Sequence, residues 1–225
     1  MSFLELISQA NLPFLGLLGL IFGALLLSCF VKVATVLAIV RAGLGLESIP
    51  SAFITGGLAV VLSFFVMYPT LQNSTKAWES NLAQGANKNI KALESAVEVW
   101  KGFLKQHTGE EELEQFIILA EELDKQTPEG GESREPEGES AEKANELRTL
   151  APAFLITELK EAFATGLRLF LPFLVVDLLI AHILVGMGLT KLNPVLVSLP
   201  IKLMLFVLVD GWTLITTNLV TTYLS

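Results

Sequence analysis

Two long stretches of the chain contain no charged side chain. Residues 6–31 carry none over 26 positions, and residues 48–75 carry none over 28. A helix of about 20 residues covers the roughly 30 Å hydrocarbon core of a bilayer, so each stretch is long enough to cross one. Two further apolar stretches, 169–189 and 195–224, are also long enough but contain internal charges. The pattern predicts an all-α membrane protein.

Short connections separate the stretches within each pair. Residues 41–48 hold Gly43 and Gly45, residues 190–194 end at Pro194, and each loop has a single basic residue. These turn residues predict two helical hairpins, 12–71 and 169–224. Pro200 lies just inside the last stretch and is expected to kink that helix. The chain then divides into an N-terminal apolar hairpin (1–75), an amphipathic helical insert (76–126), an acidic disordered linker (127–148) and a C-terminal apolar hairpin (149–225).

The net charge of −8 is concentrated in the middle of the chain. Residues 76–148 hold 17 acidic and 9 basic residues, whereas the other 152 residues hold 6 of each. With 52% hydrophobic residues and a mean hydropathy of +0.60, the composition disfavours an ordinary soluble protein. The absence of a basic excess disfavours nucleic-acid binding, which requires cations to displace phosphate counterions. The single cysteine, Cys29, excludes an intrachain disulfide and is expected in the core.

The insert is expected to be mostly helical. Apolar residues recur at spacings of three and four in two faces, which predicts two amphipathic helices. The first face comprises Ile90, Leu93, Val97, Trp100 and Leu104, and the second Leu113, Phe116, Ile117, Ala120 and Leu123. The segment TPEGGESREPEGES at 127–140 has no large apolar residue, which predicts a disordered tether. The alternative is an acidic strip that docks a basic partner.

Charge also indicates how the chain lies in a membrane. Arg41 and Lys191 fall in the short loops, and the positive-inside rule places such loops in the cytoplasm, with the insert and both termini outside. No Lys or Arg precedes Lys32, and the first apolar run is longer than a signal peptide requires. We therefore expect residues 1–40 to remain in the mature protein.

Five polar residues lie inside the apolar stretches, where an unpaired charge is unfavourable by several kcal/mol. Two bases and two acids suggest mutual pairing, with Lys32 or Lys202 opposite Asp177 or Asp210, within or between subunits. A proton or ion pathway through Asp177 and His182 is the functional alternative. These two residues are five positions apart and do not share a helix face.

No enzymatic motif is present in the sequence. A P-loop, GxSxG, HExxH and any Cys/His cluster are all absent, and the two histidines, His107 and His182, are 75 residues apart. We therefore predict no catalytic, cofactor or metal site.

Two motifs resemble a known family. PAFLITELKEAF at 152–163 and PIKLMLFVLVDGW at 200–212 are similar to the signature motifs of the FliP/SctR family, also called YscR or HrcR. Three more segments resemble the family pattern, FVKVATVLAIVRAGLG, GGLAVVLSFFVMYP and LPFLVVDLLIAHIL. The resemblance covers most of the chain apart from the acidic linker.

The resemblance implies a subunit of the type III secretion export gate in the bacterial inner membrane, in a flagellar or virulence system. It implies a homo-oligomeric ring of five that joins SctS/FliQ-type and SctT/FliR-type subunits. Together these form a portal for unfolded secreted proteins. Further implied partners are the SctU/FlhB-type and SctV/FlhA-type export components and membrane lipid. In that family the assembled hairpins are raised largely above the membrane plane.

The resemblance also implies a pore constriction in the second hairpin. Family members commonly carry three methionines before the loop proline, but the aligned positions here are Leu189, Thr190 and Lys191. The candidate constriction is Met187, Gly188, Leu189, Thr190 and Lys191.

Two other classes of protein are compatible with the composition. One is an ion-coupled secondary transporter or small channel that uses Asp177, His182 and Asp210, although the two hairpins show no internal repeat of the kind usual in transporters. The other is a monomeric scaffold.

Overall fold

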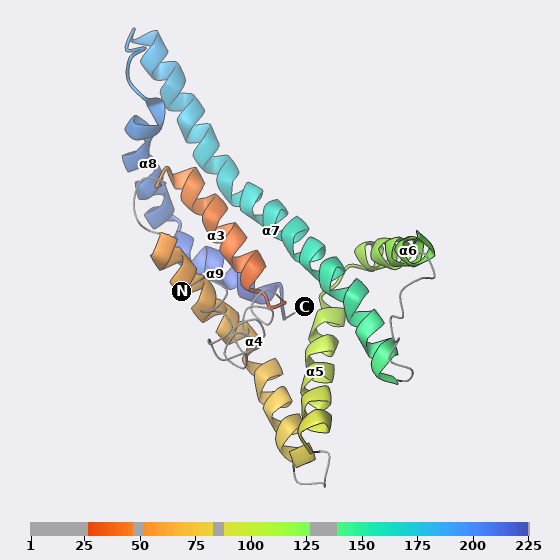
Figure 1. Cartoon of the computed structure of the whole chain (residues 1–225). Helices are drawn as coiled ribbons and strands as arrows, with labels where there is room; N and C mark the ends of the chain where they lie inside the picture. The colour runs from red at the N-terminus through yellow and green to blue at the C-terminus, as the bar shows by residue number, and fades with distance from the viewer. Residues whose placement is uncertain (1–26, 47–51, 83–87, 127–138, 225) are drawn as a thin grey trace, which may run out of the picture.

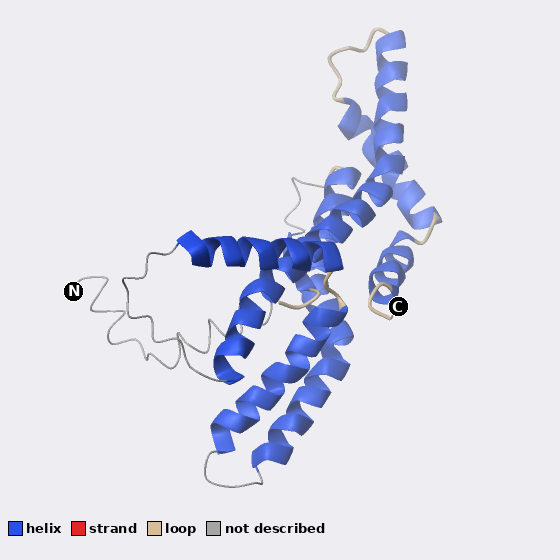
Figure 2. Cartoon of the chain, turned by 90° about the vertical axis from the view of Figure 1, so that its right-hand side faces the viewer, coloured by secondary structure: helices blue, strands red, loops and turns tan. Residues whose placement is uncertain are grey.

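The computed structural model of the chain describes residues 27–46, 52–82, 88–126 and 139–224. All regular structure in these ranges is helical, which confirms the predicted all-α fold (Figure 2). The helices are α3 (Phe30–Leu44), α4 (Ala52–Leu82), α5 (Lys88–Gln106), α6 (Glu110–Gln126), α7 (Glu139–Gly186), α8 (Pro194–Leu208) and α9 (Gly211–Thr221). Most of the first predicted stretch, 6–31, lies outside these residues.

The first described helix, α3, ends at a glycine. Gly45 has a φ of 76°, and its N–H donates to the carbonyl of Ala42 while the N–H of Leu46 donates to Arg41. A left-handed residue after the last turn is a common helix terminus, and glycine adopts it without strain. The chain then returns as α4, which passes through Pro69 and continues to Leu82, beyond the predicted apolar stretch.

The two amphipathic segments form α5 and α6, as predicted from their periodicity. In Figure 1, α5 lies alongside the end of α4, and α6 projects sideways from the N-terminal part of α7. The chain between Gln126 and Glu139, which holds most of the predicted linker, is outside the described residues.

Helix α7 is much longer than the predicted third stretch. It runs without interruption from Glu139 to Gly186 and contains Pro152 and Pro172. Residues 139–148, which we assigned to a disordered linker, form its first turns. Their sequence, ESAEKANELR, is rich in residues of high helix propensity, so the helix begins directly after the Gly- and Pro-rich segment 127–138. The boundaries at 76 and 149 therefore fall inside α4 and α7.

The second hairpin turns between α7 and α8. Gly188 has a φ of 74°, and the side chain of Asn193 accepts from the N–H of Val195 at the start of α8. Pro194 occupies the first helical position, where its missing N–H is no disadvantage. Helix α8 continues through Pro200, and the sharp bend of 61° lies further on, between Leu208 and Gly211.

Two hydrophobic clusters hold the helices together. One joins α3 to α4, α7, α8 and α9, and the other joins α4, α5, the first half of α7 and Tyr223. Two described helices are long and apolar enough to cross a membrane, Phe53–Ala77 and Glu146–Gly186, or three spans if the bent α8–α9 pair counts as one. Few residues of the two long helices are buried within the chain. Their apolar surfaces are therefore available to lipid or to other proteins.

Candidate functional site

Lys202 joins α7 and α8 of the second hairpin to α3. Its side chain is 1% exposed, and its Nζ lies 2.6 Å from Oδ2 of Asp177 on α7. The same Nζ donates to the carbonyl oxygen of Gly43 on α3 at 2.8 Å. Ser198, one turn before Lys202 on α8, donates to Oδ1 of Asp177. The cation and its acceptors thus satisfy one another in an apolar region, as buried charges require.

Lys32 makes a second buried network, with partners that we did not predict. We expected Asp177 or Asp210, but Lys32 is paired with Glu161 and lies 3.7 Å from Glu158, both on α7. Tyr223, close to the C-terminus, donates its hydroxyl to Glu158, and Lys32 Nζ lies 4.6 Å from the centre of the Tyr223 ring. Glu158 and Glu161 were not among the predicted pairing residues, because they lie before the third apolar stretch, which begins at residue 169. The motif PAFLITELKEAF, which contains both, was the available signal.

Asp210 is not joined to either lysine. It is exposed, and no ion pair to it occurs among the residues that the structure describes. It adopts a left-handed conformation, with φ 49° and ψ 55°, between α8 and α9. Of the four residues that we proposed to pair, Lys202 and Asp177 lie together, whereas Lys32 and Asp210 lie apart from them.

The candidate constriction forms the tip of the second hairpin. Met187, Gly188, Leu189, Thr190 and Lys191 are all exposed there. Figure 1 shows this tip at the opposite end of the molecule from α5. Met187 is 66% exposed and Leu189 is 42% exposed, so the loop presents apolar side chains that its own chain does not cover. Such side chains can close a narrow passage only when several copies meet.

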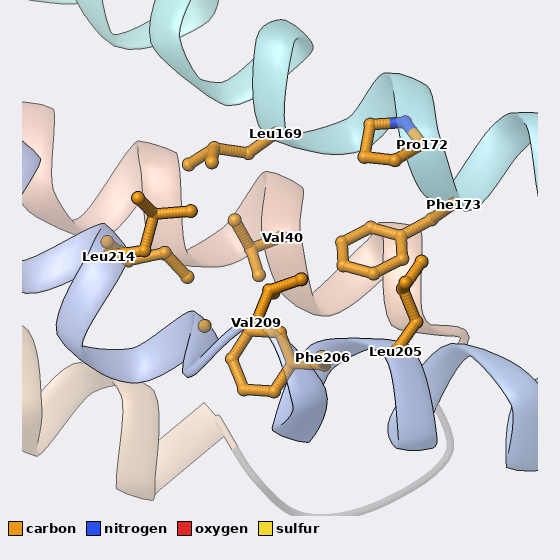
Figure 3. A pocket seen from close by; sticks show the side chains of 10 residues that line it. Val40, Leu169, Pro172, Phe173, Leu205, Phe206, Val209 and Leu214 are labelled. Atoms are coloured by element: carbon orange, nitrogen blue, oxygen red, sulfur yellow. The ribbon is translucent and has the colours of Figure 1, made fainter.

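Among the residues that the structure describes, no three His, Cys, Asp or Glu side chains are placed to hold a metal ion. The apolar region contains a cavity of about 210 Å³ at the bend between α8 and α9, lined by hydrophobic residues of α3, α7, α8 and α9 (Figure 3).

Salt bridges attach the insert to α7. Lys160 lies 2.7 Å from Glu112, and Lys101 pairs with Glu146.

Glu112 lies at the start of α6, where its carboxylate contacts α7. The hydrogen bond from Lys160 lowers the pKa of the Glu112 carboxyl group below its usual range. Gly109, just before α6, donates its N–H to the hydroxyl of Thr157 at 3.0 Å. These contacts hold the N-terminal end of α6 against α7.

These features define an all-helical membrane protein whose hairpins are joined by buried ion pairs and whose long helices expose apolar faces. The sequence matches the FliP family over residues 13–219, and the chain belongs to this family. The flagellar biosynthetic protein FliP of Bacillus subtilis (strain 168) is 38% identical over 199 residues, which cover 88% of this chain and 84% of the relative.

Relatives also occur in other secretion systems. The surface presentation of antigens protein SpaP of Salmonella typhimurium is 35% identical over 200 residues, 88% of each chain. The hypersensitivity response secretion protein HrcR of Ralstonia nicotianae is 34% identical over 207 residues, 90% of each chain. The resemblance to the FliP/SctR family of the type III secretion export apparatus is thereby confirmed.

Proposed function

We propose that the chain is the core subunit of a bacterial type III secretion export gate. In this proposal five copies form a ring, and the ring joins SctS/FliQ-type and SctT/FliR-type subunits to make a portal for unfolded proteins across the inner membrane. Membership of the FliP family supports this role, as do the names of the relatives, which refer to flagellar biosynthesis and secretion.

The observation that carries the proposal is the contrast between the inside and the outside of the hairpins. Inside, Lys202 and Lys32 are paired and almost inaccessible. Outside, α4 and α7 present large apolar side chains, with Phe53 88% exposed, Phe64 61% and Val175 62%. A monomer in water does not tolerate an apolar surface of this extent, so the surface is covered by other subunits and by lipid.

The loops and the insert are proposed to lie on opposite sides of the gate. The hairpin tip with Lys191 and the end of α3 with Arg41 carry the basic residues of the short connections. The positive-inside rule places these loops in the cytoplasm and the acidic insert in the periplasm. SctU/FlhB-type and SctV/FlhA-type components would then meet the gate from the cytoplasmic side.

The hairpin tip is proposed as the constriction. Rotation about a central axis would bring one copy of Met187 and one of Leu189 from each subunit into a ring of flexible apolar side chains. Lys191 points away from the axis in this arrangement, since a ring of like charges repels itself. The mechanism is passive: the subunit supplies a narrow conduit and catalyses no reaction.

Two experiments test these statements. Native mass measurement and cryo-EM of the detergent-extracted full chain, alone and with its export partners, are expected to show a closed ring, whereas a monomer under both conditions contradicts the proposal. Met187→Ala with Leu189→Ala is expected to raise ion leakage and to alter secretion. The matched control is Leu196→Ala, which changes an equally exposed residue just beyond the loop. If the loop variant behaves like the control, the constriction is elsewhere.

An ion-coupled transporter is less well supported. Asp177 is held by Lys202 and Ser198, and the Nδ1 of His182 is 2.7 Å from the carbonyl oxygen of Leu178 in its own helix. These two residues therefore do not form a continuous polar path. Ion flux through a monomeric species would favour the transporter over the ring.

A further inference from the structure

Two opposite charges lie on the apolar outer surface of the hairpins without a partner in their own chain. Arg168 is on α7 and Asp210 is at the bend between α8 and α9, and both are exposed. Within the described part of the chain, neither one makes a salt bridge or a side-chain hydrogen bond. Lys32 and Lys202 already have other acceptors, so neither is available to Asp210.

Arg168 lies in the middle of an apolar helix face. Leu171 and Val175 follow at spacings of three and four on the same side of α7, and they are 54% and 62% exposed. This side is turned away from Phe173, which packs into the core. A guanidinium group cannot be deprotonated in a protein, so an interface that covers this face must supply an acceptor.

Asp210 occupies a comparable position on the other part of the hairpin. Val207 and Leu208, just before it, are 76% and 80% exposed. Asp210 stands at the N-cap of α9, where aspartate usually accepts from the first N–H groups, but its carboxylate makes no capping bond. Its left-handed backbone, uncommon outside glycine and asparagine or aspartate, leaves the carboxylate on the surface.

The apolar cavity shows that the two charges lie at a similar height along the length of the hairpin. Leu169, the residue after Arg168, lines this cavity together with Val209 and Gly211, the two neighbours of Asp210 (Figure 3). The two charges nevertheless form no ion pair or hydrogen bond with each other within one chain. Rotation about a ring axis preserves the level of each residue and brings one face of a subunit against a different face of the next.

We propose that Arg168 of one copy pairs with Asp210 of the neighbouring copy across the subunit interface. This inference rests on the ring of the proposed function and identifies one of its contacts. The occupant of the surface is a second copy of this chain, because its two unpaired charges are opposite in sign and surrounded by apolar side chains. A lipid phosphate could satisfy Arg168 but would leave Asp210 unpaired.

Cysteine cross-linking tests the contact in the full chain. In a Cys29→Ala background, the variant with Arg168→Cys and Asp210→Cys is expected to form disulfide-linked dimers and higher multimers on mild oxidation. The matched control combines Arg168→Cys with Met204→Cys, which is 71% exposed on α8 but more than a turn away from the bend. A ring seen by native mass with no cross-linking above the control refutes the pairing and leaves the ring intact. A monomeric parent protein refutes the proposed function instead.

A double-mutant cycle separates a direct pair from two independent effects. Arg168→Met and Asp210→Asn are chosen because methionine suits the helix and asparagine tolerates the left-handed backbone. Each single variant is expected to reduce the ring fraction about tenfold, and the double variant to be no worse than either single one. Multiplied losses in the double variant would show that the two residues act separately, as expected if Arg168 binds lipid phosphate. Circular dichroism verifies that each variant is folded.

Discussion

Replacing Lys202 with methionine removes the cation that joins α7 and α8 of the second hairpin to α3. The substitution leaves Asp177 without its ion pair and the Gly43 carbonyl without its donor. Removing one partner of a buried pair is unfavourable by about 3–5 kcal/mol. The Asp177 side chain is 22% exposed and can recover part of its hydration, so the lower value of about 3 kcal/mol applies.

For a chain of this length, each kcal/mol lowers the midpoint of thermal unfolding by about 2–4 °C. Lys202→Met is therefore expected to lower the midpoint by about 6–12 °C, measured on the detergent-extracted protein. Adding Asp177→Leu should restore most of the loss, because no charge is then left unpaired in the apolar region. The control is Arg148→Met, which breaks an exposed pair with Asp124 and should have little effect. If Lys202→Met behaves like the control, or if Asp177→Leu gives no recovery, the buried pair does not hold the hairpin as described.

Three further predictions follow from local geometry. Gly211→Ala would place a methyl group against the ring of Phe206, which lies in the notch left by the missing side chain, so thermal stability should fall and Phe206→Leu should partly restore it. The depressed pKa of Glu112 makes its bond to Lys160 most stabilising above the ordinary pKa of a carboxyl group. This stabilisation is lost as the pH falls through the lower folded-state value. The protection of α6 amides against hydrogen exchange, corrected for the intrinsic effect of pH on the exchange rate, should therefore fall at acidic pH in the parent protein and fall less in Glu112→Gln. Gly166→Leu should weaken the contact between α3 and α7, where an isoleucine of α3 packs directly over the glycine, and a normal melting temperature for this variant would contradict that packing.

The insert shows how far sequence periodicity can be used. The spacing of apolar residues predicted α5 and α6 as helices, because the 3.6-residue period of a helix face is recorded locally in the chain. Composition misled the assignment at the start of α7, where the acidic and polar residues 139–148 were included in a linker. Residues 139–148 have good helix propensity, and they continue a helix that is packed further along.

The bend in the last stretch shows the opposite limit. Pro200 was the expected site of a kink, but the chain turns by 61° after Leu208. The turn occurs where Asp210 adopts a left-handed conformation and Gly211 leaves space for Phe206. Backbone conformation of this kind depends on a side chain five positions earlier and on the neighbouring helices, so no local proline rule could identify it.

The sequence by itself determined the helical class, the apolar stretches and the family, because each depends on composition, periodicity or motifs that are contiguous in the chain. Only the tertiary structure decided which charges are neighbours. Lys32 and Glu161 are 129 positions apart, and their pairing depends on how α3 packs against α7. The requirement that a buried charge find a partner is general, but the identity of that partner is a property of the packed helices.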